Sequence, residues 1–246
     1  MLFYGKGLRD AAARDFLQEA ITRLQGIFRG VFAGDNVVLL ERNLGWRRNP
    51  RFMAAFRQHA RSPQEQSLEL RLNTLAWAAD HALHVPGDFV ECGVFRGFSS
   101  AVICSYLEFA QIPRQFWLYD TFAGIPQDFD TENHPTRPVP NLYEDVVSRF
   151  RPYPNVRIVP GTIPDSFAGG APEHIAYLHI DLNSSKSEIA ALDALFERVS
   201  PGGVVVFDDY GWSWYATQQV AEDAWVAQRN HRILELPTGQ GLLIKH

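Results

Sequence analysis

The stretch GVVVFDDYG (Gly203–Gly211) decides the fold class, because its apolar run ends on two adjacent aspartates. An earlier run, IAYLHID (Ile175–Asp181), ends on a third aspartate in the same way. Short apolar runs of this kind are typical of buried parallel strands. Ligands of an open parallel sheet bind outside the carboxyl ends of its strands. We therefore expect Asp181, Asp208 and Asp209 to converge at one edge of a sheet.

Three neighbouring carboxylates repel one another unless a cation or a proton lies between them. Carboxylate oxygens are hard ligands that suit magnesium or calcium. Adjacent residues in a strand point to opposite faces, so Asp208 and Asp209 can share an ion only if the strand ends before them. In the alternative interpretation, one of the two caps the following helix or faces solvent.

Residues 86–246 alternate short apolar runs with helical patterns, which predicts an α/β fold with a mainly parallel sheet. Further strands are expected at DFVECGV, QFWLYD and NVRIVPG, with helices near 99–109, 143–150, 187–198 and 217–228. The end of the chain, RILELPTGQGLLIKH, predicts a hairpin that adds an antiparallel strand.

The first 85 residues predict a mostly helical cap, and residues 86–246 a second domain. One helix is expected over Ala11–Phe32. Another begins after Ser62, where Ser-Pro-Gln-Glu forms a capping box, and ends near Pro86. The segment 123–142 is rich in Pro, Asp and Asn and contains His134, so we expect a loop that covers a site.

Composition excludes several classes of protein. A net charge of -5 and a pI near 5.9 argue against a nucleic-acid partner. A cluster of arginines around Arg47 is still compatible with binding an anionic ligand or surface. No run approaches the roughly 20 apolar residues of a membrane span, and the N-terminus lacks the apolar core of a signal peptide. We expect a cytoplasmic protein in which Cys92 and Cys104 are buried and unreactive.

The motif VECGVFRGFSS (Val90–Ser100) carries a strand through a glycine turn into a helix. Glycines at such a turn let the backbone approach a nucleotide. The spacing of Gly93 and Gly97 is not G-x-G-x-x-G, which disfavours NAD or FAD. Glu91 beside the turn is a candidate for the amino group of a cationic ligand. A purely steric need for glycine remains the alternative.

Two further motifs follow the next strands. In LYDTF, Asp120 ends a strand where acids accept hydrogen bonds from ribose hydroxyls, and Phe122 is placed to pack on an adenine ring. In PGTIPD (Pro160–Asp165), the loop after the third strand is placed to border the adenine. Each motif alone also fits a loop cap or a plain turn, but the first two motifs on successive strands are more specific.

Taken together, ECGVFRG, LYDTF, HID and VSPGGVVVFDDYG resemble the bacterial macrocin, mycinamicin and novobiocin sugar O-methyltransferases. The resemblance covers about residues 87–219. It implies a Rossmann-like class I methyltransferase fold with a seven-stranded sheet that uses S-adenosylmethionine. It implies that Mg²⁺ is held by Asp181, Asp208 and Asp209, and that the methyl donor is held by Glu91, Gly93, Phe95, Ser99, Asp120, Thr121, Phe122, Gly161 and Thr162.

One departure from the family concerns proton transfer. The family has a second aspartate two residues after the first metal ligand, proposed as general base, but this chain has Asn183 there. An asparagine cannot accept a proton at neutral pH. We therefore list Asp181, Asn183 and His179 as catalytic candidates, with Asn183 orienting the acceptor. His179 shares a strand face with Asp181, and is either a base or a hydrogen-bonded core residue.

The sequence thus predicts a magnesium-dependent O-methyltransferase for a hydroxyl of a sugar or glycosylated small molecule. An aromatic cluster, Tyr210, Trp212, Trp214 and Tyr215, follows the aspartates; aromatic faces suit sugar rings, although such a cluster also fits hydrophobic packing. Tyr210, Trp212 and His134 are the candidate acceptor contacts. The family and the apolar N-terminal helices favour a homo-oligomer. Three alternatives remain: a non-sugar acceptor, a donor-binding protein without turnover because of Asn183, and a nicotinamide dehydrogenase.

Overall fold

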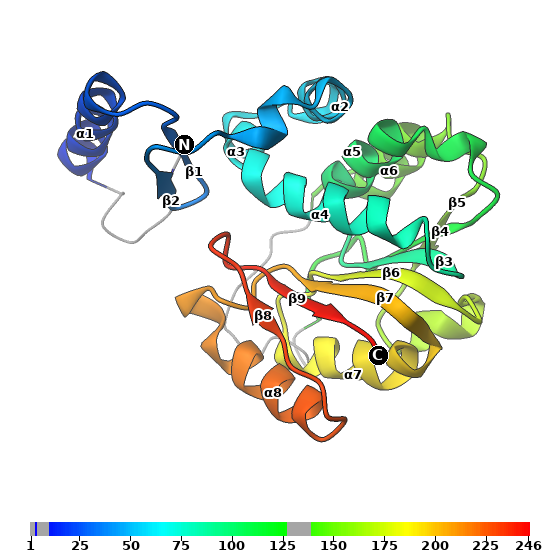
Figure 1. Cartoon of the computed structure of the whole chain (residues 1–246). Helices are drawn as coiled ribbons and strands as arrows, with labels where there is room; N and C mark the ends of the chain where they lie inside the picture. The colour runs from blue at the N-terminus through cyan, green and yellow to red at the C-terminus, as the bar shows by residue number, and fades with distance from the viewer. Residues whose placement is uncertain (1–2, 4–9, 127–138) are drawn as a thin grey trace. The chain divides into compact units, whose positions relative to one another are not determined.

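A seven-stranded sheet organises residues 75–246 in the computed structural model, which describes residue 3 and residues 10–126 and 139–246 (Figure 1). The strand order is β5-β4-β3-β6-β7-β9-β8. The strands are β3 (Asp88–Cys92), β4 (Phe116–Asp120), β5 (Val156–Pro160), β6 (Ile175–Ile180), β7 (Val199–Phe207), β8 (Leu234–Glu235) and β9 (Gly241–Ile244). Five neighbouring strands are parallel, while β9 runs antiparallel to both β7 and β8. The predicted mainly parallel sheet with a C-terminal hairpin is confirmed.

Helices cover both faces of this sheet (Figure 1). On one face lie α5 (Phe98–Leu107) and α6 (Leu142–Phe150), and on the other lie α7 (Ser185–Leu195) and α8 (Ala216–Ala227). Short 3-10 turns occupy Phe109–Gln111, Asp165–Gly169, Phe196–Arg198 and Ser213–Tyr215. Every residue of β6 is buried, as its continuous apolar run predicts.

The chain order creates a switch point between β3 and β6. From β3 the chain adds β4 and β5 on one side, then returns to add β6 and β7 on the other. Ligands of open α/β sheets bind in the crevice at such a point, beyond the carboxyl ends of the strands. Gly93, Asp120, Asp181 and Asp208 all lie at these ends.

Residues 1–74 form a separate unit from residues 75–246, and the division falls within α4 (Glu69–Ala82). The sequence placed the boundary at residue 85, and a covering role for the N-terminal residues stays a prediction. The unit contains α1 (Ala11–Ile27), a 3-10 turn (Gly45–Arg48), α2 (Pro50–His59) and α3 (Pro63–Ser67).

The N-terminal unit also contains a hairpin that the sequence analysis missed. Strands β1 (Phe32–Gly34) and β2 (Val37–Leu39) pair antiparallel. They are joined by Asp35 and Asn36, both at positive φ, a conformation that Asp and Asn tolerate better than most residues. The helix predicted over Ala11–Phe32 therefore ends earlier, at Ile27.

The predicted capping box is confirmed. The Ser62 hydroxyl accepts a hydrogen bond from Glu65 N, and the Glu65 carboxylate accepts one from Ser62 N. The helix that follows is interrupted at Leu68, so the predicted single helix is two, α3 and α4. Within the same unit, buried Asp35 accepts a hydrogen bond from buried Arg71 at 2.8 Å.

Candidate active site

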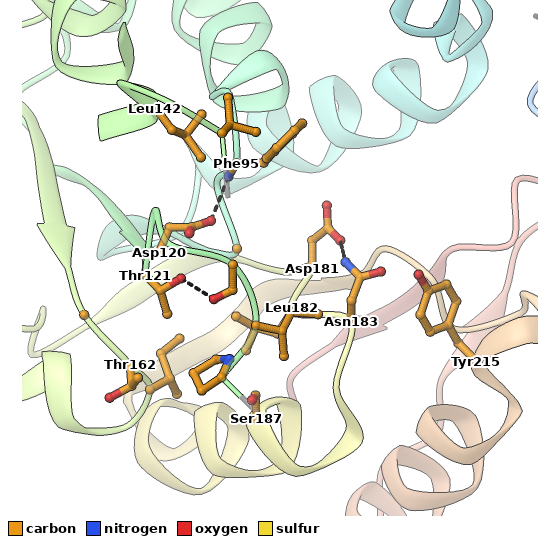
Figure 2. A pocket seen from close by; sticks show the side chains of 17 residues that line it. Phe95, Asp120, Thr121, Leu142, Thr162, Asp181, Leu182, Asn183, Ser187 and Tyr215 are labelled. Atoms are coloured by element: carbon orange, nitrogen blue, oxygen red, sulfur yellow. Dashed lines mark hydrogen bonds between the residues drawn. The ribbon is translucent and has the colours of Figure 1, made fainter. Parts of the chain in front are cut away.

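A cavity of about 390 Å³ opens at the carboxyl ends of the central strands (Figure 2). This volume lies within the range of small-molecule sites, which is roughly 300–1,000 Å³. Its lining residues come from the ends of β3, β4, β5 and β6, from the loops after them, and from the start of α6, α7 and α8: Gly93, Phe95, Asp120, Thr121, Gly124, Ile125, Pro126, Val139, Leu142, Gly161, Thr162, Ile163, Asp181, Leu182, Asn183, Ser187 and Tyr215.

The glycine turn after β3 brings its backbone against the end of β6. Gly93 has φ of +90°, and a Cβ built on it would lie 1.8 Å from the carbonyl oxygen of Asp181. No side chain fits in that space, so glycine is required here both for its backbone conformation and for the close approach. Gly97, with φ of +67°, then leads into α5.

Asp120 holds this turn in place. Its Oδ2 accepts hydrogen bonds from Val94 N and Phe95 N, and its Oδ1 accepts one from Phe122 N, each at 2.7 Å. Phe95 and Phe122 both have positive φ, which is strained for residues with a Cβ. The carboxylate therefore offsets strain in two loops that flank the cavity. Its predicted role toward a ribose stays a prediction.

The loop after β6 places Asp181 and Asn183 at the cavity (Figure 2). Asn183 has φ of +55°, and its amide donates a hydrogen bond to Asp181 Oδ1 at 3.1 Å. Behind them, Leu182 N donates to the buried carboxylate of Glu188 at 3.2 Å, and Ser184 caps α7. Asn183 thus orients the Asp181 carboxylate by donating to it.

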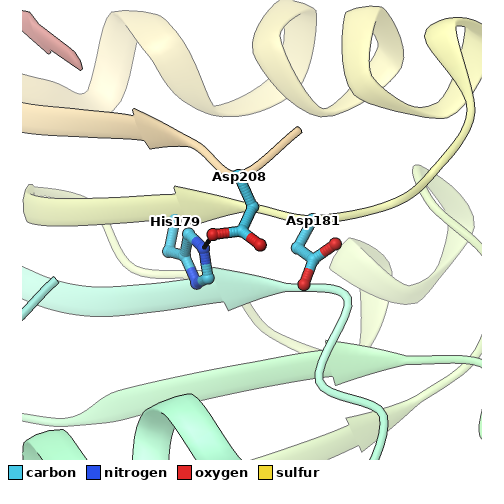
Figure 3. A group of neighbouring side chains, drawn as sticks. All are labelled: His179, Asp181 and Asp208. Atoms are coloured by element: carbon cyan, nitrogen blue, oxygen red, sulfur yellow. Dashed lines mark hydrogen bonds and ion pairs between the residues drawn. The ribbon is translucent and has the colours of Figure 1, made fainter. Parts of the chain in front are cut away.

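Three side chains form a group with the spacing of a metal site (Figure 3). One ligand atom each from His179, Asp181 and Asp208 lies within 4.8 Å of the others. The register explains the grouping: β6 pairs with β7 through Ile180 and Phe207, so Asp181 and Asp208 are the next facing pair. Side chains that face each other across paired strands point to the same side of the sheet.

Asp209 does not belong to this group. Asp208 N still donates to Ile180 O at 2.9 Å, so the ladder continues one residue beyond β7. Adjacent side chains of an extended chain point to opposite faces of the sheet. Asp208 and Asp209 can therefore share an ion only where the chain is no longer extended. The assignment of Asp209 as a metal ligand stays a prediction, while His179 occupies the third place in the group.

His179 is fully buried between two carboxylates. Its Nδ1 lies 3.0 Å from Glu91 Oε1 and its Nε2 lies 3.2 Å from Asp208 Oδ1. Burial alone lowers the pKa of His179, but the hydrogen bonds to Asp208 and Glu91 and their charges raise that pKa to about 10. The two flanking carboxylates thus favour the protonated ring. This geometry suits His179 to holding the Asp208 carboxylate in place, and not to accepting a proton as a general base.

Glu91 contacts this histidine, and it is not among the residues that line the cavity. Burial raises the pKa of its carboxyl group, and His179 opposes the rise. Its other oxygen, Oε2, is buried and has no hydrogen-bond partner among the described residues. A role for Glu91 at the amino group of a ligand stays a prediction.

The predicted residues therefore divide into two sets. Those that line the cavity are Gly93, Phe95, Asp120, Thr121, Gly161, Thr162, Asp181 and Asn183. Those that lie outside the lining are Glu91, Ser99, Phe122, His179, Asp208, Asp209, Tyr210 and Trp212. His134 falls outside the described residues, so its predicted contact stays a prediction.

The aromatic residues after β7 differ in their contacts. Tyr210 is buried, and its hydroxyl donates to Asp223 of α8 at 2.7 Å. The Trp212 ring packs near Trp214, with centroids 5.8 Å apart. Tyr215 is the member of this cluster that lines the cavity. The sequence identified the cluster but not which ring reaches the cavity.

Some other lining residues belong to loops that the sequence already pointed to, Gly124–Pro126 and Val139 to the predicted loop 123–142 and Ile163 to PGTIPD, whereas Leu182 and Ser187 were missed. Ile163, Leu182 and the stretch Gly124–Pro126 contribute apolar surface from loops. Gln240, on the C-terminal hairpin, donates to Asp208 at 2.9 Å and was also missed. Only the strand register, which places residue 240 beside residue 208, points to this contact.

Comparison with known proteins gives a consistent match. A family model described as macrocin-O-methyltransferase (TylF) matches residues 68–238. An 8-demethyl-8-(2,3-dimethoxy-alpha-L-rhamnosyl)-tetracenomycin-C 4'-O-methyltransferase from Streptomyces olivaceus is 32% identical over 57% of this chain and 60% of its own length. A mycinamicin III 3''-O-methyltransferase from Micromonospora griseorubida is 31% identical over 57% of this chain and 62% of its own length. The matched region thus spans only part of each relative.

Solved structures share the fold. The O-methyltransferase NovP is 25% identical, with a TM-score of 0.60 over 71% of this chain and 79% of its own. The calicheamicin methyltransferase CalS11 is 20% identical, with a TM-score of 0.57 over 80% of this chain and 92% of its own. The predicted Rossmann-like class I methyltransferase fold is confirmed. Within the part of the chain that the structure describes, no helix has the length and apolar character needed to span a membrane.

Proposed function

The chain belongs to the macrocin-O-methyltransferase (TylF) family, and from that premise we propose that it transfers a methyl group from S-adenosylmethionine to a hydroxyl of a sugar or glycosylated small molecule. One observation carries the proposal. A single cavity joins the residues predicted to hold the donor, such as Gly93 and Asp120, to Asp181 and Asn183 on the acceptor side. Donor and acceptor would therefore meet in one cavity.

The cavity fits the methyl donor. Gly93 and Gly161 line the cavity at two strand ends, and Thr121 and Thr162 place hydroxyls beside them. Asp120 Oδ1 accepts one hydrogen bond from the chain, and a carboxylate oxygen can accept a second, from a ribose hydroxyl. When bound, the donor supplies a methyl group already activated on a sulfonium. The chain's own contribution is to align the two reactants, which alone can supply a large part of a rate enhancement.

Asp181 and Asp208 fit a magnesium ion. Both carboxylates belong to the group whose ligand atoms lie within 4.8 Å of one another, and hard oxygen donors suit this metal. His179 fits less well as a ligand, because both of its ring nitrogens face carboxylates. A bound ion would lower the pKa of a coordinated sugar hydroxyl. We propose Asp181 and Asp208 as ligands, with Asp209 as a further candidate.

The protein side chains at this site do not include a neutral-pH base in the position that the family uses. Asn183 donates to Asp181 and cannot accept a proton. Both ring nitrogens of His179 face carboxylates, Glu91 and Asp208, so neither nitrogen is directed at the acceptor. We therefore propose that the acceptor hydroxyl loses its proton to solvent, and a cation held by Asp181 and Asp208 would supply the acidity that this loss needs. Tyr215 lines the cavity, and we propose it as an aromatic contact for the acceptor.

Methyl transfer from labelled S-adenosylmethionine to a panel of deoxysugar glycosides tests this proposal. We expect transfer to at least one glycoside in Mg²⁺ and loss of transfer in chelator. Asp208→Asn should lose the Mg²⁺-dependent activity but keep S-adenosylhomocysteine binding, whereas the exposed control Asp80→Asn should keep both. Equal turnover with and without chelator would refute the role of the metal. Transfer to catechols or amines alone would refute the sugar acceptor.

A further inference from the structure

The Asp208 carboxylate is held by two buried donors at one oxygen. Its Oδ1 lies 3.2 Å from His179 Nε2 and accepts a hydrogen bond from Gln240 Nε2 at 2.9 Å. Both donor residues have 0% exposed surface. Two donors from different elements, strand β6 and the turn before β9, oppose rotation of the carboxylate more than one donor can. The second oxygen of Asp208 is turned toward Asp181 (Figure 3).

Gln240 is in turn fixed by its own neighbours. The Thr238 hydroxyl donates to Gln240 Oε1 at 2.9 Å, which leaves the amide nitrogen to face Asp208. This arrangement matches the chemistry, because a carboxylate only accepts and an amide nitrogen only donates. Thr238 is 3% exposed, so water does not readily replace its hydroxyl.

The C-terminal hairpin positions Gln240 through its register and its turn. Gly241 of β9 pairs with Phe207 of β7, so residue 240 lies beside residue 208. The turn is tied down where Gly211 N donates to Gly239 O at 2.7 Å. Gly239 has φ of +78°, and a Cβ there would lie 2.5 Å from the Trp212 ring nitrogen, so the turn has little freedom to change.

We propose that Gln240, set in place by Thr238, is a positioning residue that orients Asp208 to share a divalent cation with Asp181. This inference rests on the proposed function, because it assigns a role around the same metal. His179 holds Asp208 from the sheet side, and Gln240 holds it from the hairpin side. Hydrogen-bond partners of metal ligands commonly set metal affinity, and their loss typically costs about 10- to 100-fold.

The experiment measures Mn²⁺ binding, by electron paramagnetic resonance, to the full chain with S-adenosylhomocysteine present. Mg²⁺ competition identifies the site. Gln240→Met keeps the side-chain length but removes the donor, and Thr238→Val removes the hydroxyl that orients it. Thr238→Ser retains that hydroxyl, and Gln228→Met is a matched control at an exposed position. Calorimetry with S-adenosylhomocysteine in chelator, and melting in chelator, report on the fold.

We expect Gln240→Met to weaken Mn²⁺ binding about tenfold or more, with Thr238→Val intermediate and Thr238→Ser and Gln228→Met close to wild type. S-adenosylhomocysteine affinity in chelator should stay within about twofold. Wild-type Mn²⁺ affinity in both Gln240→Met and Thr238→Val would overturn the inference while leaving the metal site intact. Parallel losses of Mn²⁺ and S-adenosylhomocysteine binding in both variants would also overturn it, because they indicate a structural role. No Mn²⁺ binding by the wild-type protein would instead overturn the proposed metal function itself.

Discussion

Asp120→Asn tests how the donor side of the cavity is built. The carboxylate accepts three backbone hydrogen bonds at 2.7 Å, from Val94, Phe95 and Phe122. An amide has a single oxygen, so it can keep the two bonds at Oδ2 or the one at Oδ1, but not all three. At least one charge-assisted bond is lost, worth about 1.5–3 kcal/mol, and the remaining bonds become weaker neutral ones.

Water offsets part of this loss, because Asp120 is half-buried and Phe95 is exposed. We therefore expect the free energy of unfolding to fall by about 2–3 kcal/mol. For a chain of this size that corresponds to a fall in Tm of roughly 4–12 °C. Relief of the positive φ at Phe95 and Phe122 should also displace the glycine turn and weaken donor binding.

Thermal unfolding and calorimetric titration with S-adenosylhomocysteine in chelator measure these two effects. Asp80→Asn, an exposed aspartate on α4, is the matched control and should change neither quantity. A Tm and an affinity equal to those of the wild type would refute the reasoning. Weaker binding with an unchanged Tm would assign Asp120 to the ligand alone, and not to the support of the loops.

Three further predictions follow from buried groups and close contacts. Burial, together with the nearby carboxylate of Glu222, raises the pKa of Glu188, and burial also raises the pKa of Glu222. Because the folded state then binds more protons than the unfolded state above the ordinary carboxyl pKa of about 4.3, stability falls as pH rises. Glu222→Gln should therefore raise Tm, with a gain that grows from pH 5 to pH 8; a gain independent of pH in melting curves would contradict this. Gly93→Ala places a Cβ 1.8 Å from Asp181 O, so we expect a loss of several kcal/mol in stability and of donor binding, and a wild-type Tm would show that the contact relaxes freely. Asn183→Asp brings a second carboxylate beside Asp181, at the position of the aspartate proposed as general base in the family, so we expect faster turnover in Mg²⁺, and unchanged turnover would show that the proton leaves by another route.

Apolar patterning was sufficient to predict the sheet. The strands β6 and β7 are buried runs that end on aspartates, and the alternation with helices predicts their parallel order. The capping box at Ser62 was predictable for a different reason, because its hydrogen bonds join residues that lie within four positions of each other. The β1–β2 hairpin was missed because each strand has only three residues, too few for a periodic pattern.

The site was predictable only as far as strand ends are predictable. Gly93, Asp120 and Asp181 lie at or directly after strand ends, and all three line the cavity. The grouping of Asp208 with His179, and not with Asp209, depends on how far the ladder extends beyond β7. Contacts across the sheet depend on register, which local patterns do not specify, so the contact between residue 240 and residue 208 emerged only in three dimensions.

We propose that one cavity binds the methyl donor, with a divalent cation beside it. The most direct test is a calorimetric titration of the purified protein with S-adenosylhomocysteine, first in chelator and then in excess Mg²⁺, followed by Mg²⁺ alone. We predict stoichiometric S-adenosylhomocysteine binding in both conditions and a separate heat of Mg²⁺ binding that Asp208→Asn removes. Absence of S-adenosylhomocysteine binding in both conditions would contradict the account.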